Sequence, residues 1–171
     1  MPLSFNTIRY NQLSGGSEGK ILQAVTATKT DTFSSTSTSF TDLTDITANI
    51  TPASTDNKVF INVSLALANS STVGGWVYVN FVRGSTNILL GDTASNRTRC
   101  SFQVHGMHTG EHVPHTYFFL DSPSTTSATT YKVQVKTNTG TIYLNRSSRD
   151  NDHAAYDGRS TSTITLMEVG A

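Results

Sequence analysis

The amino-acid sequence predicts an all-β protein, an antiparallel β-sandwich with a jelly-roll-like arrangement of strands. Thr and Ser are abundant, whereas Lys and Glu, which favour soluble helices, are scarce; Thr packs well on a pleated surface. Short apolar segments with alternating polar residues recur between turn residues, and no segment has the period of an amphipathic helix. About ten regularly spaced strands are typical of sandwiches and jelly rolls.

The first strand is expected at residues 21–28, followed by a Ser/Thr-rich stretch, 31–41, with Phe33 and Phe40 as apolar anchors. A strand at 45–50 ends at Thr51-Pro52, because proline interrupts a sheet ladder. Further strands are expected at 58–68, 75–83, 88–90, 99–104, 141–145 and 161–169.

Two more strands are expected at residues 117–120 and 131–135, one on either side of a polar loop. The second alternates apolar and polar residues, which predicts one buried and one solvated face. The first is apolar on both faces, which predicts a strand that is covered on both sides. Pro123 ends it. A pair of this size needs other strands to pack on.

The chain divides into an N-terminal docking arm with a flexible linker, residues 1–19, and a sandwich domain, residues 20–171. The arm is either a frayed tail or a docking peptide, and its apolar content favours docking. A Gly- and Ser-rich joint follows at 14–19. The candidate partner-binding residues are Leu3, Phe5, Ile8, Arg9 and Tyr10. The N-terminus lacks the basic-then-apolar pattern of a signal peptide, so synthesis in the cytoplasm is expected.

Charge and cysteine content limit the function classes. Charged residues make up 14% of the chain and cancel to zero net charge, so no general attraction to nucleic acid or to an anionic membrane is expected. No apolar run is long enough to span a bilayer. The single Cys100 excludes an intrachain disulfide framework and a Cys-based zinc site.

Histidines gather in residues 105–115, where imidazole ligands would suit zinc, copper or nickel. Their spacing does not match His-Glu-x-x-His, and the glycines and Pro114 argue against a helix there. A wet loop between strands is therefore favoured over a metal site, for which His108 and His112 are the weak candidates. No cofactor is expected.

Three other groups have two interpretations each. The acidic loop 149–157 suits calcium or, preferably, a polar turn. Trp76 and Tyr78 on one strand face suit sugar stacking or core packing. Five arginines suit a subunit interface or solvent: Arg97, Arg99, Arg146, Arg149 and Arg159. No Gly-x-Ser-x-Gly, Walker A or dinucleotide motif is present, so the protein is not expected to be an enzyme, and no catalytic residue is assigned.

Several segments, in order, resemble a family of bacteriophage virion proteins that is common among cyanophages and other marine phages. No single motif is chemically diagnostic, and the ordered set makes the match specific. The segments are 20–25, 32–33 with 40–42, 50–52, 82–86 with 91–92, 96–99, 119–123, 130–134, 145–147 and 162–169. The histidine-rich segment 105–115 is not part of the pattern.

The resemblance implies a β-sandwich that forms a homotrimer, either as a capsid decoration (cement) protein or as the tip of a tail or head fibre. The short arm in place of a fibre shaft favours decoration. The expected partner is then the major capsid protein, bound through the arm on the capsid surface of the virion. The alternative is a receptor-binding module for a host surface glycan or protein, with Trp76, Tyr78 and loop 149–157 as its candidates.

Overall fold

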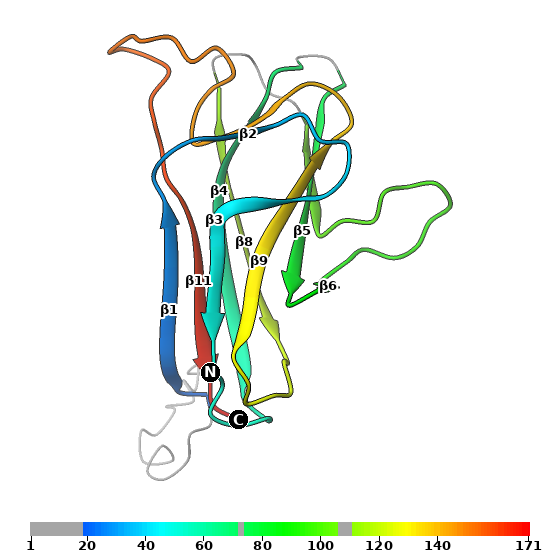
Figure 1. Cartoon of the computed structure of the whole chain (residues 1–171), viewed down its shortest axis with the longest axis vertical. Helices are drawn as coiled ribbons and strands as arrows, with labels where there is room; N and C mark the ends of the chain where they lie inside the picture. The colour runs from blue at the N-terminus through cyan, green and yellow to red at the C-terminus, as the bar shows by residue number, and fades with distance from the viewer. Residues whose placement is uncertain (1–18, 72–73, 106–110) are drawn as a thin grey trace, which may run out of the picture.

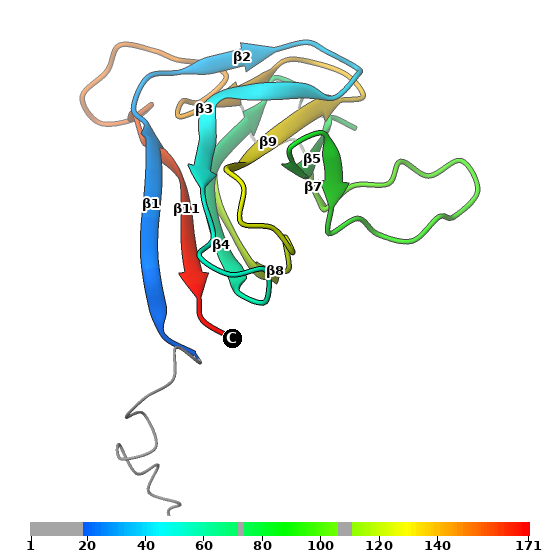
Figure 2. The same ribbon diagram turned by 60° about the horizontal axis from the view of Figure 1, so that its bottom comes forward.

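The computed structural model describes residues 19–71, 74–105 and 111–171, and these fold into eleven strands and no helix. The strands form two antiparallel sheets that lie face to face (Figures 1 and 2). The all-β sandwich with a jelly-roll-like character is therefore confirmed. Within the described residues no helix could cross a lipid bilayer.

The first sheet has six strands, with β4 at its centre. One edge of β4 pairs with β11 along residues 58–64 and with β10 at its far end, and its other edge pairs with β8. Strand β1 pairs with β11, and strand β2 pairs with β10. The bounds are β1 (Ile21–Lys29), β2 (Phe33–Ser35), β4 (Lys58–Asn69), β8 (Val113–Asp121), β10 (Ile142–Leu144) and β11 (Ser162–Val169).

The second sheet has five strands, in the order β3-β9-β5-β6, with β7 also paired to β5. Both β6 and β7 lie along one edge of β5, because its other edge is taken by β9. The bounds are β3 (Thr41–Ile50), β5 (Trp76–Arg83), β6 (Thr86–Ile88), β7 (Phe102–His105) and β9 (Thr129–Thr137).

The core lies between the sheets and follows the predicted alternation. The inward residues of β4, from Val59 to Leu67, are buried. They face the buried inward side of β5 and β9, which includes Val79 and Val133. Each such side chain contributes about 1.5–3 kcal/mol by leaving water, so the core holds the two layers together.

The two strands flanking the polar loop do not pair with each other, contrary to the idea of a small two-stranded unit. Strand β8 pairs with β4 in the first sheet, and β9 pairs with β3 and β5 in the second. Loop 122–128 therefore connects the two layers. A period-2 pattern identifies a strand's buried face, not its hydrogen-bonding neighbour.

The prediction that residues 117–120 are covered on both sides is wrong for the isolated chain. Phe118 is 66% exposed and Leu120 is 55% exposed, because only one face of β8 lies against the second sheet.

Candidate functional site

The free edge of β8 is the most unusual surface of the described chain. Of the described strands only β4 pairs with it, so the main-chain groups of its other edge have no strand partner. Native proteins normally protect such an edge with charged side chains, especially Lys. Between Val113 and Leu120 the strand carries no Lys, Arg, Asp or Glu. The strand does carry Pro114 near its start, so residues 115–120 form the uncharged part of this edge.

The outward flank of β8 is apolar at one end. Leu120 lies beside Phe60 of β4, which in turn lies beside Met167 of β11, so these three side chains form a row across the sheet. The ring of Phe118 is 6.1 Å from that of Phe60, centre to centre. The row gives an outside face of the first sheet that can bury apolar area against another surface.

The inward flank of β8 is aromatic. Tyr117 stacks on Phe102 of β7 with ring centres 5.0 Å apart and planes 5° from parallel. Phe119 lies 5.0 Å from Phe81 of β5, which also contacts Tyr117 at 5.8 Å. These rings close the gap between the two sheets on the β7–β8 side. Tyr117 nevertheless stays 37% exposed.

Strand β8 also borders a shallow hollow of about 270 Å³, lined by Thr116, Tyr117 and Phe118. Both flanks of the strand thus offer apolar surface. We call β8 with Phe60, Phe102 and Met167 the β8 edge.

The histidines predicted as a cluster are separated by the fold. His105 lies in β7 with its ring 4.7 Å from that of Trp76, edge on, whereas His115 lies in β8, in the other sheet. His112 is partly buried just before β8, and His108 lies outside the described residues. Within the described ranges no three His, Cys, Asp or Glu side chains are placed to hold a metal ion.

His115 points toward the second sheet, where its ring lies 6.5 Å from Phe102. Its Nε2 atom is buried without a hydrogen-bond partner. Burial disfavours the charged imidazolium and lowers the pKa of His115 below 6.5. The residue is therefore neutral in the folded protein near neutral pH.

An inter-sheet contact fixes the end of β8. Asp121 accepts a hydrogen bond from the Tyr131 hydroxyl and an ion-paired bond from Arg83, both at 2.7 Å to Oδ2. Arg83 also donates to the carbonyl of Ser122 at 3.1 Å. Burial, with the negative charge of Asp121, raises the pKa of Tyr131. The hydroxyl therefore stays protonated and joins β9 to β8.

A second buried network closes the same end of the sandwich. The carboxylate of Glu168 accepts hydrogen bonds from Gln23 and Asn57 at 2.5 Å, and from the backbone N–H of Ala53 at 2.7 Å. Burial alone would raise the pKa of Glu168, but these three donors outweigh it, so the pKa is lowered.

These two networks join segments that are far apart in the sequence. Arg83, Asp121 and Tyr131 come from three of the quoted segments, and Gln23 and Glu168 come from two more. Parts of these segments therefore meet in space within this chain. The sequence signal for these contacts is a carboxylate, Asp121 or Glu168, at the end of an otherwise apolar strand.

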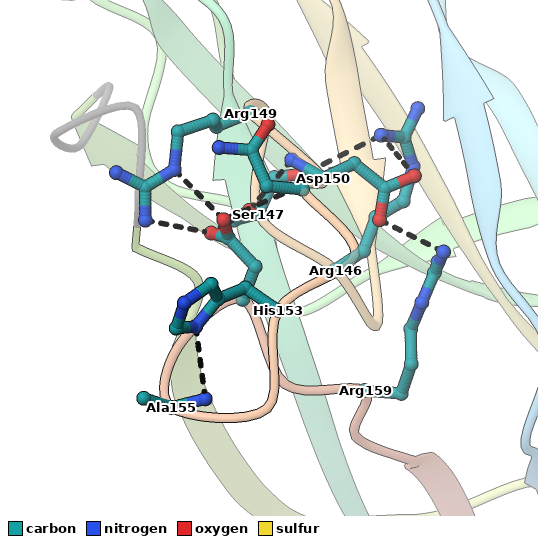
Figure 3. Close-up of polar contacts among 9 residues, drawn as sticks. Arg146, Ser147, Arg149, Asp150, His153, Ala155 and Arg159 are labelled. Atoms are coloured by element: carbon teal, nitrogen blue, oxygen red, sulfur yellow. Dashed lines mark hydrogen bonds and ion pairs between the residues drawn. The ribbon is translucent and has the colours of Figure 1, made fainter.

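The polar loop 145–160 lies at the opposite end of the sandwich (Figure 1). Figure 3 shows its polar contacts. The carboxylate of Asp157 accepts hydrogen bonds from Arg149 at 2.7 and 3.1 Å and from the Ser147 hydroxyl at 2.7 Å. The Arg149 guanidinium lowers the pKa of Asp157 to about 2. The fully buried side chain of Asp157 therefore remains charged.

Asp150 completes the loop's ion pairs, with Arg146 at 3.1 Å and Arg159 at 2.8 Å. Arginines therefore pair with two of the loop's carboxylates, those of Asp150 and Asp157. Of the five candidate interface arginines, three are paired within this loop, and the Nε of Arg99 donates to the carbonyl of Gly91.

The loop also encloses a polar hollow of about 220 Å³, lined by Asp150, Asn151, Asp152, His153, Asp157 and Arg159. Trp76 and Tyr78 do not enter the core. They are half-buried residues that alternate with the buried Val77 and Val79, and Tyr78 lies under the ammonium group of Lys136 at 5.2 Å.

No known family model matches the sequence, and no curated protein matches it. Among solved structures, the chain is similar to a chain of the T=1 particles derived from infectious bursal virus, with 16% identity and a TM-score of 0.46. The match covers 87% of this chain and 36% of that one, so the chain spans about a third of its length. A likeness at this level carries no argument about function.

Proposed function

We propose that the protein is a structural component of a virus particle, a homotrimeric decoration protein that binds the assembled capsid. The observation that carries the proposal is the β8 edge, an exposed apolar surface that suits lasting contact with other proteins. The ordered resemblance to phage virion proteins supports the same role. The proposal assigns no enzymatic activity and no cofactor.

Such a protein stabilises the shell because it binds the assembled state and not the free subunits. The proposed docking residues Leu3, Phe5, Ile8, Arg9 and Tyr10 lie outside the described residues. The point from which they extend is described. Gly19 donates a backbone hydrogen bond to Gly170 at 2.7 Å, so the arm joins the domain beside the C-terminus. This end would face the shell, and loop 145–160 would face outward.

Deletion of residues 1–12 tests the docking role. We expect the truncated protein to keep its fold and its oligomeric state but to lose binding to empty capsids in co-sedimentation. A matched control is Tyr156→Ser, on the exposed outer loop, which should bind like the unaltered protein. Full capsid binding by the truncated protein would refute the arm as the docking element.

The number of copies in each particle tests the location. Quantitative mass spectrometry of purified particles should give a simple ratio of this protein to the major capsid protein. A handful of copies in each particle would instead place it at a fibre tip.

The second candidate function is receptor binding, which the polar hollow of loop 145–160 favours. Carboxylate, amide and guanidinium groups around one hollow are suited to sugar hydroxyls. In this case the isolated protein should bind a host surface glycan on an array. The double variant Asp152→Ala/Arg159→Ala should lose that binding, and the exposed control Leu89→Ser should keep it. Absence of glycan and host-cell binding would exclude this alternative.

A further inference from the structure

We propose that β8 lines the three-fold axis of the homotrimer, where the three copies of Phe118 and Leu120 meet. The inference rests on the trimeric state included in the proposed function, and it is independent of capsid binding. It names the surface and the partner: a free strand edge, and two further copies of the same edge.

The first argument is that β8 is exposed on both flanks. Phe118 and Leu120 are open on the outward side, and Tyr117, over Phe102, is open on the inward side. A partner seated on one face of the sheet would cover only one of these flanks. Three edges that converge on an axis cover both, because each strand lies between its two neighbours.

The second argument is charge. Side chains close to a symmetry axis meet their own equivalents, so any charge there faces a like charge. From Val113 to Leu120 the only ionisable groups are His115, held neutral and turned inward, and the Tyr117 phenol. The next charges along the chain are Glu111, two residues before the strand, and Asp121, which is already paired with Arg83. Copies of this strand can therefore meet without repulsion.

The third argument is rigidity. All nine residues of β8 are paired with β4. One end is fixed by the hydrogen bond from Tyr131 to Asp121, and the middle is fixed by the contact of Phe119 with Phe81. Phe118 and Leu120 thus project from an ordered strand, and little conformational entropy is lost when they are covered.

Cysteine cross-linking tests the axis directly. In a Cys100→Ser background, Leu120→Cys places one thiol in each subunit beside its equivalents. Under mild oxidation we expect covalent dimers on a denaturing gel, with one subunit in three left unlinked. Leu89→Cys is the matched control, because Leu89 is an exposed leucine (44%) just after β6 of the other sheet, and it should give no cross-link.

Sedimentation equilibrium gives the independent measurement. The unaltered protein should sediment as a trimer, and Phe118→Ser/Leu120→Ser should weaken association at least tenfold, whereas Leu89→Ser should not. Far-UV circular dichroism checks that both variants fold. A monomeric or dimeric native protein, or a trimer that survives the double substitution and fails to cross-link at residue 120, would overturn the inference. If the trimer cross-links at residue 120 but does not bind capsids, the decoration role is refuted and the axis inference stands.

Discussion

At the scale of single residues, stability depends on a few polar groups placed inside an apolar sandwich. Asp121 and Glu168 lie at the ends of apolar strands, and each gathers donors from distant parts of the chain. Sequence reasoning located both strands but assigned no role to either carboxylate. Their partners are separated from them by ten to over a hundred residues, so no local spacing could have revealed the contacts.

Tyr131→Phe should destabilise the fold by about 2 kcal/mol, because it removes a hydrogen bond to a charged acceptor. The free energy of unfolding, measured in urea, would show the loss. Tyr78→Phe is the control, since the described contact of Tyr78 is made through its ring. Equal effects of the two changes would contradict the inter-sheet role of the Tyr131 hydroxyl.

His115 should make stability fall in mild acid. Its pKa is lowered in the folded protein, so below its ordinary value of 6.5 the unfolded chain binds a proton that the folded chain resists. The contribution is complete above pH 6.5 and is lost as pH falls toward the folded-state pKa. Its neighbours, Phe102 and the paired Leu65, offer no charge to compensate.

The measurement is the midpoint of thermal unfolding between pH 8 and pH 5. His115→Phe should flatten the decline over this range, and an unchanged slope in the variant would exclude His115 as its source.

At the scale of strands, alternation predicted most elements well and their pairing poorly. The expected strand at 58–68 is β4 (Lys58–Asn69), and 161–169 corresponds to β11 (Ser162–Val169). By contrast, the strands on either side of loop 122–128 belong to different sheets. The alternation of β9 fits a strand in the interior of a sheet, whereas β8 has apolar residues on both faces and lies at the edge of its sheet among the described strands.

The connection between β9 and β10 depends on a glycine. Gly140 has φ +77°, and a Cβ there would lie 2.5 Å from the Asn69 side chain. Gly140→Ala should therefore destabilise the fold by more than about 1 kcal/mol, measured by chemical denaturation. Gly158→Ala, in an open position with no atom within 4 Å, should leave stability nearly unchanged. Equal stability of both variants would contradict the strain at Gly140.

At the scale of the whole molecule, the sandwich could be predicted from composition and alternation, but the site could not. The predicted docking residues lie outside the described part of the chain, and the histidines separate into two sheets. The β8 edge was present in the sequence as an uncharged strand, and the inference that it was buried is wrong for one chain. A hydrophobic pattern indicates which side chains favour burial, but it does not indicate which other residues bury them.

The two ends of the sandwich differ in a way that matters for engineering. Gly19 and Gly170 are hydrogen-bonded neighbours at one end, and loop 145–160 occupies the other (Figure 2). Under the proposed decoration role, an antigen or enzyme fused after Ala171 would emerge beside the arm and face the shell. Under the same proposal, cargo inserted between His153 and Tyr156 would face outward, which predicts that this loop is the better insertion point for displaying foreign peptides.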